Sequence, residues 1–221
     1  MRIALLAALS ALALPAMAAV PSTPAAKVEA HSVVHPGEGV TVRLPATAKH
    51  LGSERFTLYE VADAEVHVFV EEDAEKKIAR VYWVQFESYL PEKPELSYNY
   101  ADGNRPIELG GVRTWLRSNP VPTTGPMRAG SDREHVFNIL SRAGYAIPPA
   151  VMNVRLVQIL DDPTGTGKGR RELMVIYSED LALSGKTLAE LTTDGKPNAQ
   201  WPAIEQGLID RATKAVRIER R

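Results

Sequence analysis

Alternating hydrophobic and polar positions dominate the first half of the chain. Residues 40–44 alternate apolar side chains with threonine and arginine and stop at Pro45, and residues 55–70 contain two further alternating runs. Residues 78–90 form the longest such run, with apolar side chains on both faces. Period-two alternation is typical of β-strands, and a strand that is apolar on both faces is typically central. We therefore expect an antiparallel meander with residues 78–90 near its middle.

The second half of the chain combines helical and strand patterns. Ser131-Asp132-Arg133-Glu134 matches a capping box, an apolar stripe at three- and four-residue spacing follows it, and Gly144 ends the pattern. This predicts a helix over residues 131–143. Residues 151–160 and 172–178 read as two strands of a hairpin.

Two more helices are expected towards the C-terminus. One is short, at residues 187–191, and the other begins at Trp201-Pro202, where proline suits the first turn. Basic residues cluster at 211–221, and cations at the end of a helix complement its dipole. Strands and helices do not alternate as βαβ units. The sequence thus predicts an α+β fold, with an antiparallel sheet of about six strands and two or three helices packed on one of its faces.

Residues 91–130 interrupt this pattern. They contain six prolines and five glycines, and only residues 112–117 resemble a strand. Long irregular segments in a compact domain are often functional loops. We expect a single domain over residues 40–221 that includes this Pro/Gly-rich loop region.

The amino terminus predicts export. Arg2 precedes the apolar run 3–14, and Ala16-Met17-Ala18 matches an A-x-A cleavage pattern, so residues 1–18 are expected to be a signal peptide cut between Ala18 and Ala19. The run is shorter than the ~20 residues of a membrane-spanning helix, which disfavours an uncleaved anchor. Residues 19–39 are small and polar and predict a flexible leader. We expect a bacterial protein of the periplasm or the medium.

Composition and charge exclude several classes of function. The chain has 221 residues, with 26 Lys+Arg, 27 Asp+Glu and no cysteine. Loss of Arg2 with the signal peptide leaves 25 basic against 27 acidic residues, a net charge of −2. This balance argues against nucleic acid and anionic membranes as partners. The lack of cysteine excludes disulfides, thiolate metal sites and cysteine nucleophiles.

Strong catalytic and metal-binding signatures do not occur. The sequence has no G-x-S-x-G, S-x-x-K or H-E-x-x-H pattern. His31 and His35 have the spacing of helical metal ligands, but Pro36-Gly37 is incompatible with a helix there. Adjacent carboxylates such as Glu71-Glu72 give no sign of converging on a cleft. We expect neither a metal nor a cofactor.

The glycine-rich loop 161–171 is a weaker candidate. It lacks the phosphate-loop pattern, because Gly169 follows Lys168 where Ser or Thr is required. A solvated hairpin tip explains its glycines. The alternative is contact with an anion or a partner through Lys168, Arg170 and Arg171.

Aromatic residues give the most specific candidate site. Half of the 14 aromatic residues lie between Tyr82 and Trp115. Arg113, Trp115 and Arg117 would share one face of a strand, and a tryptophan flanked by guanidinium groups suits an anionic or aromatic ligand. Tyr98 and Tyr100 would form the walls of that site. The alternative is that these rings form the core and that Trp115 anchors the long loop.

These observations predict an exported, soluble binding or accessory protein without catalytic activity, which holds a small anionic or aromatic ligand or an envelope partner. One alternative is an envelope hydrolase that uses carboxylates with His67 or His135. Another is a structural interaction domain that docks through a strand edge or the basic C-terminal helix.

Overall fold

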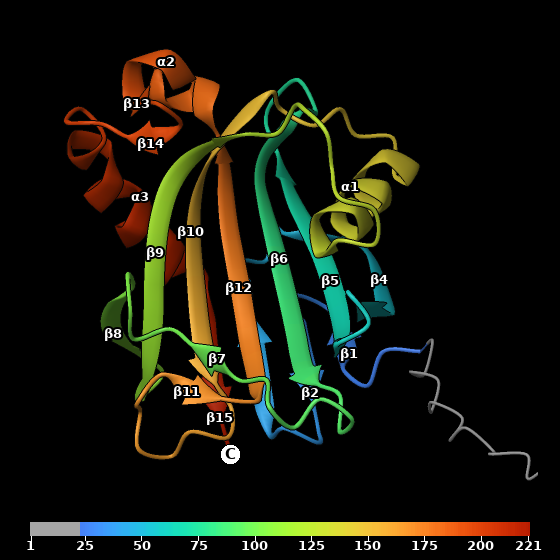
Figure 1. Ribbon diagram of the computed structural model, residues 1–221. Coiled ribbons are helices and arrows are strands. Elements are labelled where there is room, and N and C mark those ends of the chain that lie inside the picture. Colours follow the sequence, from blue (N-terminus) through green and yellow to red (C-terminus); the bar gives the residue numbers. More distant parts are fainter. Residues whose placement is uncertain (1–22) are drawn as a thin grey trace, which may run out of the picture.

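A seven-stranded antiparallel sheet forms the centre of the computed structural model, which describes residues 23–221 (Figure 1). The order across the sheet is β4 (Lys49–Leu58), β5 (Ala62–Glu72), β6 (Ile78–Tyr89), β12 (Arg171–Asp180), β10 (Ala150–Ile159), β9 (Val112–Pro122) and β8 (Arg105–Leu109). β10 and β12 form the expected antiparallel pair. The predicted signal peptide, residues 1–18 with cleavage between Ala18 and Ala19, lies outside the described residues.

Both faces of the sheet are covered, as the apolar pattern of residues 78–90 predicts. Tyr82 and Val84 of β6 pack into the main core on one face. Val81 and Trp83 pack on the other face, with the helix α1 (Asp132–Arg142). β6 lies between β5 and β12, so the prediction of a strand buried on both sides is confirmed.

A second, four-stranded sheet covers one face. It consists of β1 (Lys27–Glu29), β2 (Ser32–His35), β3 (Val40–Arg43) and β15 (Arg217–Arg220). Residues 27–35 therefore contribute two strands from the segment expected to be a leader, and the Val33 side chain is fully buried. Arg217 to Arg220 extend as a strand beside β3, whereas the sequence analysis placed them in the last helix. That helix, α3 (Pro202–Ala215), ends sooner and packs on the same face.

The helix α1 covers part of the opposite face, which we call the α1 face (Figure 1). The Ser131 hydroxyl accepts from the Glu134 backbone N–H at 3.2 Å, so the N-cap is confirmed. The Glu134 carboxylate accepts from the Gly130 N–H at 2.6 Å, one residue before the cap. Val136, Ile139 and Leu140 pack against valines of β5. The helices therefore lie on both faces, not on one.

Small elements complete the fold. The loop region 91–130 contains β7 (Tyr98–Asn99), β8 and β9, and β9 extends beyond the expected residues 112–117 to Pro122. β7 pairs with β11 (Lys168–Gly169) across the lower part of the α1 face. The remaining elements are the 3-10 helix η1 (Leu181–Ser184), α2 (Leu188–Leu191) and the ribbon β13 (Thr192–Thr193) with β14 (Lys196–Pro197). The described residues are mostly antiparallel strands with three α-helices, which fits an α+β or a mostly-β class. Their strands form two larger sheets and two ribbons, not one sheet of about six strands.

Within the described residues, no helix combines the length and the apolar character that crossing a membrane requires.

Candidate functional site

The structure places Arg113, Trp115 and Arg117 on the α1 face of β9, as the alternation predicts. Trp115 is 7% exposed and packs with Tyr98, Val157, Ile159 and Met174. A Cβ at Gly167 would lie 2.6 Å from the indole Cζ2, so the glycine-rich loop rests directly on the ring. Trp115 is therefore part of a buried cluster, as the alternative interpretation expected, but the loop it supports is the glycine-rich loop 161–171 and not the long loop 91–130.

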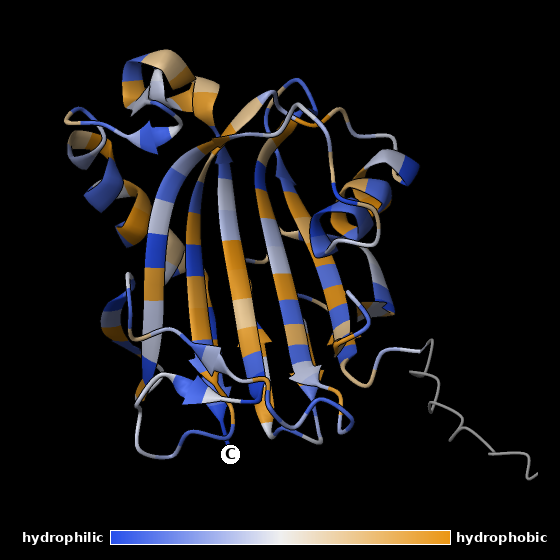
Figure 2. Ribbon diagram, viewed as in Figure 1, coloured by the Kyte–Doolittle hydropathy of each residue, from blue (hydrophilic) through white to orange (hydrophobic). Residues whose placement is uncertain are grey.

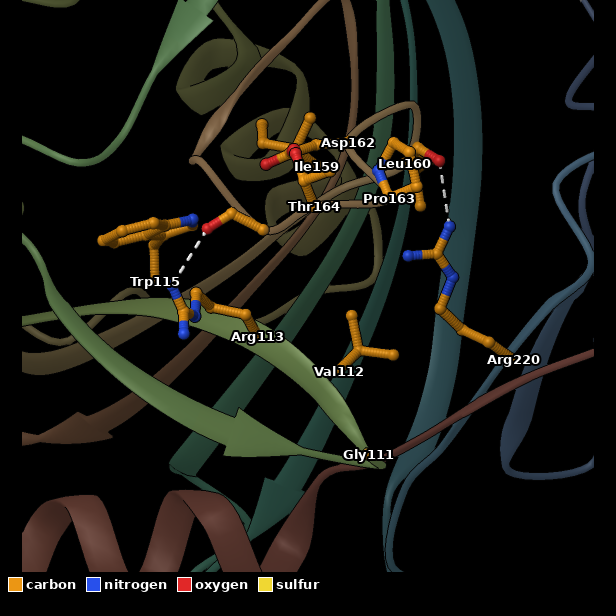
Figure 3. Close-up of a pocket in the computed structure, with 11 residues that line it drawn as sticks. Gly111, Val112, Arg113, Trp115, Ile159, Leu160, Asp162, Pro163, Thr164 and Arg220 are labelled. Carbon is orange, nitrogen blue, oxygen red and sulfur yellow. Dashed lines mark hydrogen bonds between the residues drawn. The ribbon is translucent and has the colours of Figure 1, made fainter.

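Arg113 and Trp115 also line an open pocket of about 470 Å³ at the lower end of β9 (Figure 3). Arg220 stands on the other side of this pocket. Arg113 donates to the Gly165 carbonyl at 3.1 Å and Arg220 to the Leu160 carbonyl at 3.0 Å. Both guanidinium groups thus hold the glycine-rich loop and its flank in place.

The basic residues of the glycine-rich loop have different surroundings. Arg170 donates to the carbonyls of Leu90, Lys93 and Leu96 at 2.6–3.0 Å and thereby fixes residues 90–96. Arg171 forms an ion pair with Glu38 at 2.8 Å. Lys168 is exposed on β11. Two of the three predicted anion or partner contacts are therefore engaged within the chain.

Tyr98 and Tyr100 stack with their ring centroids 6.2 Å apart and cover the lower half of the α1 face. The Tyr98 hydroxyl donates to Glu87 at 2.6 Å. The Tyr100 ring lies 5.3 Å from the guanidinium carbon of Arg155. Neither tyrosine lines the pocket beside Arg113 and Trp115. The side chains that they contact, Glu87 and Arg155, are ones that the sequence pattern does not single out.

Glu87 and Glu172 stand directly opposite each other on β6 and β12, behind the two tyrosines. The pKa of the Glu172 carboxyl is raised to about 8, first by burial and then by the Glu87 carboxylate, against the opposing effects of the Tyr100 hydroxyl and Arg155. Burial also raises the pKa of Glu87, against hydrogen bonds from Tyr98 and Gln85. Glu172 Oε2 is buried without a hydrogen-bond partner among the described residues. At neutral pH this pair therefore carries less negative charge than two ordinary carboxylates.

A chain of hydrogen bonds connects this pair to Trp83. The Trp83 indole N–H donates to Gln85 Oε1 at 2.9 Å, and Gln85 Nε2 donates to Glu87 at 2.7 Å. The indole N–H is therefore satisfied along β6, while the ring faces the space beneath α1.

That space is a cavity of about 240 Å³ between α1 and the upper part of the sheet. Most of its wall is apolar, formed by residues of β6, β9, α1, β10, β12 and the turn before β10. The main apolar residues are Val81, Trp83, Val121, Val136, Phe137, Leu140, Ile147, Val151 and Ile176. Polar groups occur at Thr123, Arg133, Asn153 and Ser178. An apolar hollow with a few polar groups is the usual anatomy of a small-molecule site.

Polar side chains follow below the cavity on β9 and β10. Arg155 is directly opposite Arg117, and Asn153 is directly opposite Asn119. In Figure 2, hydrophilic bands alternate with hydrophobic ones along both strands. A signal for this group exists in the sequence, because Asn153 and Arg155 share one face of an otherwise apolar run. Their partners on β9 depend on strand pairing and are not visible in it.

A separate polar chain lies on the opposite face. Ser53 Oγ is 2.7 Å from His67 Nδ1 and 3.0 Å from His50 Nε2, and His67 Nε2 is 3.4 Å from Glu65. His67 is fully buried, whereas Ser53 is partly exposed. Neither residue lines the pocket beside Arg113.

The other residue of the hydrolase alternative, His135, is also engaged. Its Nδ1 lies 2.6 Å from Glu54, and its ring stacks on Phe56 with centroids 3.6 Å apart. Within residues 23–221, no cluster of three His, Asp or Glu side chains has the arrangement of a metal site.

Comparison with protein-family models, with curated proteins and with solved structures gives no match for this chain.

Proposed function

We propose that the mature chain is an exported, non-catalytic binding protein that holds one small ligand in the cavity between α1 and the seven-stranded sheet. The observation that carries this proposal is the cavity itself: about 240 Å³, mostly apolar, with a few polar groups on its wall. An apolar cavity of about 150 Å³ takes up benzene. The space beneath α1 therefore suits a ring or a short alkyl chain.

The position of the cavity supports reversible binding. The cavity lies between rigid strands on one side and a single helix with its flanking loops on the other. The wall thus combines strands of the sheet with one helix that packs on them through its apolar stripe. Trp83 lines the cavity and its N–H is already satisfied, so the ring offers apolar surface without an unpaired donor.

The non-catalytic part of the proposal rests on the surroundings of the candidate catalytic groups. His67 and Ser53 lie on the other face of the sheet from the cavity, and His135 is paired with Glu54. None of the three lines the cavity. A ligand bound beneath α1 would therefore meet no nucleophile paired with a base.

A cavity-filling variant tests the proposal. Ser178 lines the cavity and is half-buried. Leucine at this position would occupy the space and bury about two or three additional carbon groups, at ~0.8 kcal/mol each, so Ser178→Leu is expected to fold with at least wild-type stability. We expect 1-hexanol to shift amide NMR signals of β6, β12 and α1 in the wild type. Its affinity should fall at least about tenfold in Ser178→Leu.

Ser178→Ala is the matched control, because it removes the hydroxyl without filling the space. Wild-type affinity in Ser178→Ala together with loss in Ser178→Leu supports the cavity as the site. If 1-hexanol shifts no amide signals around the cavity, the proposal is wrong. The intact mass of chain exported by a bacterial host tests the other half: a mature protein that begins at Ala19 is expected.

A further inference from the structure

Two arginines occupy directly opposite positions on β9 and β10. Arg117 and Arg155 are directly opposite in the register and lie on the α1 face. Residues directly opposite in an antiparallel pair have Cβ atoms about 5 Å apart, and like charges in such positions repel. An anion bound between the two arginines would relieve this repulsion, unless acidic side chains already neutralise both.

The existing partners of these arginines leave much of their hydrogen-bonding capacity unused. Arg155 donates to the Asn104 side chain at 3.1 Å and lies over Tyr100, but its Nε is buried without a partner. Arg117 is exposed and belongs to none of the ion pairs among the described residues. A guanidinium group has five N–H donors that match a carboxylate in pairs.

The nearest carboxyls do not remove this positive charge. Glu172 is the acidic group that acts on Arg155 from β12, and its pKa is raised to about 8, so it is mostly protonated at pH 7. Asp132, at the start of α1, also has a raised pKa because it is buried. The carboxyl that acts on Arg155 is therefore mostly neutral at pH 7.

The asparagine pair connects the arginines to the cavity. Asn153 is two residues from Arg155 on the same face, a spacing of about 7 Å along a strand, and it also lines the cavity. Its Oδ1 is buried without a hydrogen-bond partner among the described residues. A half-turn of this amide presents either its oxygen or its nitrogen to a ligand. A polar path thus runs from the apolar cavity to the two guanidinium groups.

We propose that the ligand is a small amphipathic carboxylate. Its apolar end fills the cavity beneath α1, and its carboxylate lies between Arg117 and Arg155 beside Asn153. This inference rests on the proposed function, and it adds the chemical class and the orientation of the ligand. It also shifts the predicted anion contact from the Arg113–Trp115 end of β9 to its middle.

Two probes with the same chain length separate this inference from the proposed function. Hexanoate carries the carboxylate and 1-hexanol does not, so only the former uses the arginines. We expect hexanoate to bind the full mature chain at least about tenfold more tightly than 1-hexanol at pH 7, measured by NMR titration. Arg117→Gln should reduce this preference to less than about threefold and leave the affinity for 1-hexanol unchanged.

Arg105→Gln is the matched control. Arg105 is exposed, and it lies on the neighbouring strand β8, opposite Leu116, on the other face of the sheet. The preference for hexanoate should persist in this variant. Arg155→Gln, accepted only with an unchanged melting temperature, should repeat the effect of Arg117→Gln.

Three results are decisive. Preference for hexanoate that disappears in Arg117→Gln and persists in Arg105→Gln establishes the carboxylate site. Equal binding of the two probes, or a preference that Arg117→Gln leaves intact, overturns the carboxylate inference while the cavity proposal stands. If neither probe binds the wild type, both proposals fall together.

Discussion

On the α1 face, the ionisation of individual carboxyl groups depends on the side chains around them. Glu172 is an example: in the unfolded chain its carboxyl ionises near 4.5, whereas in the folded protein it ionises near pH 8 because it is buried beside Glu87. Between these pH values the folded state retains a proton that the unfolded state has released. The free energy of unfolding must therefore fall as pH rises through this range.

We expect Glu172→Gln to flatten this pH dependence. Between about pH 5 and about pH 9, the free energy of unfolding of the wild type should fall by on the order of 4 kcal/mol more than that of the variant, because about three units of the pKa shift lie in this range at ~1.4 kcal/mol each. Urea denaturation across this range measures the difference. Glu92→Gln is the control, because Glu92 is exposed. Parallel pH curves for the wild type and Glu172→Gln would contradict the prediction.

A second prediction at this scale concerns Gly167. Its φ is +79°, and an added Cβ would lie 2.6 Å from Trp115 Cζ2. Gly167→Ala should therefore destabilise the protein by about 2 kcal/mol or more, through backbone strain plus the clash. Gly103 has φ +73° with open space around it, so Gly103→Ala isolates the backbone part, about 1 kcal/mol. Equal losses in the two variants would show that the ring moves freely.

At the level of elements, α1 is attached to the sheet by one apolar stripe and by the contacts of His135 and Arg142 with Glu54 of β4, and to its flanking loops by a few hydrogen bonds. The Ser131 cap fixes its start, and Arg133 donates to the carbonyl of Thr123 at 2.5 Å. Since this helix forms the outer wall of the cavity, its stability and ligand binding are coupled.

We expect Ser131→Ala to lower the stability of the protein by about 1 kcal/mol, because an N–H at the start of the helix loses its acceptor. Binding of 1-hexanol should weaken along with it. Ser141, exposed on the same helix, provides the comparison, and Ser141→Ala should change neither quantity by a measurable amount. A normal melting temperature for Ser131→Ala would mean that the cap contributes little here.

At the level of the whole molecule, the C-terminal strand pairs with a strand from the beginning of the described residues. β15 at the C-terminus pairs with β3, and Ile218 is buried in the main core between the two larger sheets. The Gly110 backbone lies directly against the Ile218 carbonyl, where a side chain would not fit. The C-terminus is thus a structural part of the sandwich.

Ile218→Ala should therefore cost about 2–4 kcal/mol, which is typical when a large buried side chain is truncated. Its neighbour Arg217 is exposed on the same strand, and Arg217→Ala should remain within about 0.5 kcal/mol of wild type. Thermal and urea unfolding measure both. If the two variants are equally stable, the C-terminal strand is not part of the cooperative core.

The sequence by itself determined the local elements: the alternating strands, the capped helix at residues 131–143 and the hairpin formed by β10 and β12. These depend on neighbours a few residues apart, so period and cap residues suffice to predict them. Only the tertiary structure decided which residues meet across strands, including Glu87 with Glu172 and Arg117 with Arg155.

The second sheet and the cavity beneath α1 likewise depend on the tertiary structure. β2 and β15 carry short, weak patterns that become strands only because β3 lies between them. In the same way, the cavity requires α1 to pack on strands from both halves of the chain. The pairing of β6 with β12 and of β3 with β15 joins residues 83 to 180 positions apart, and no local period encodes such contacts.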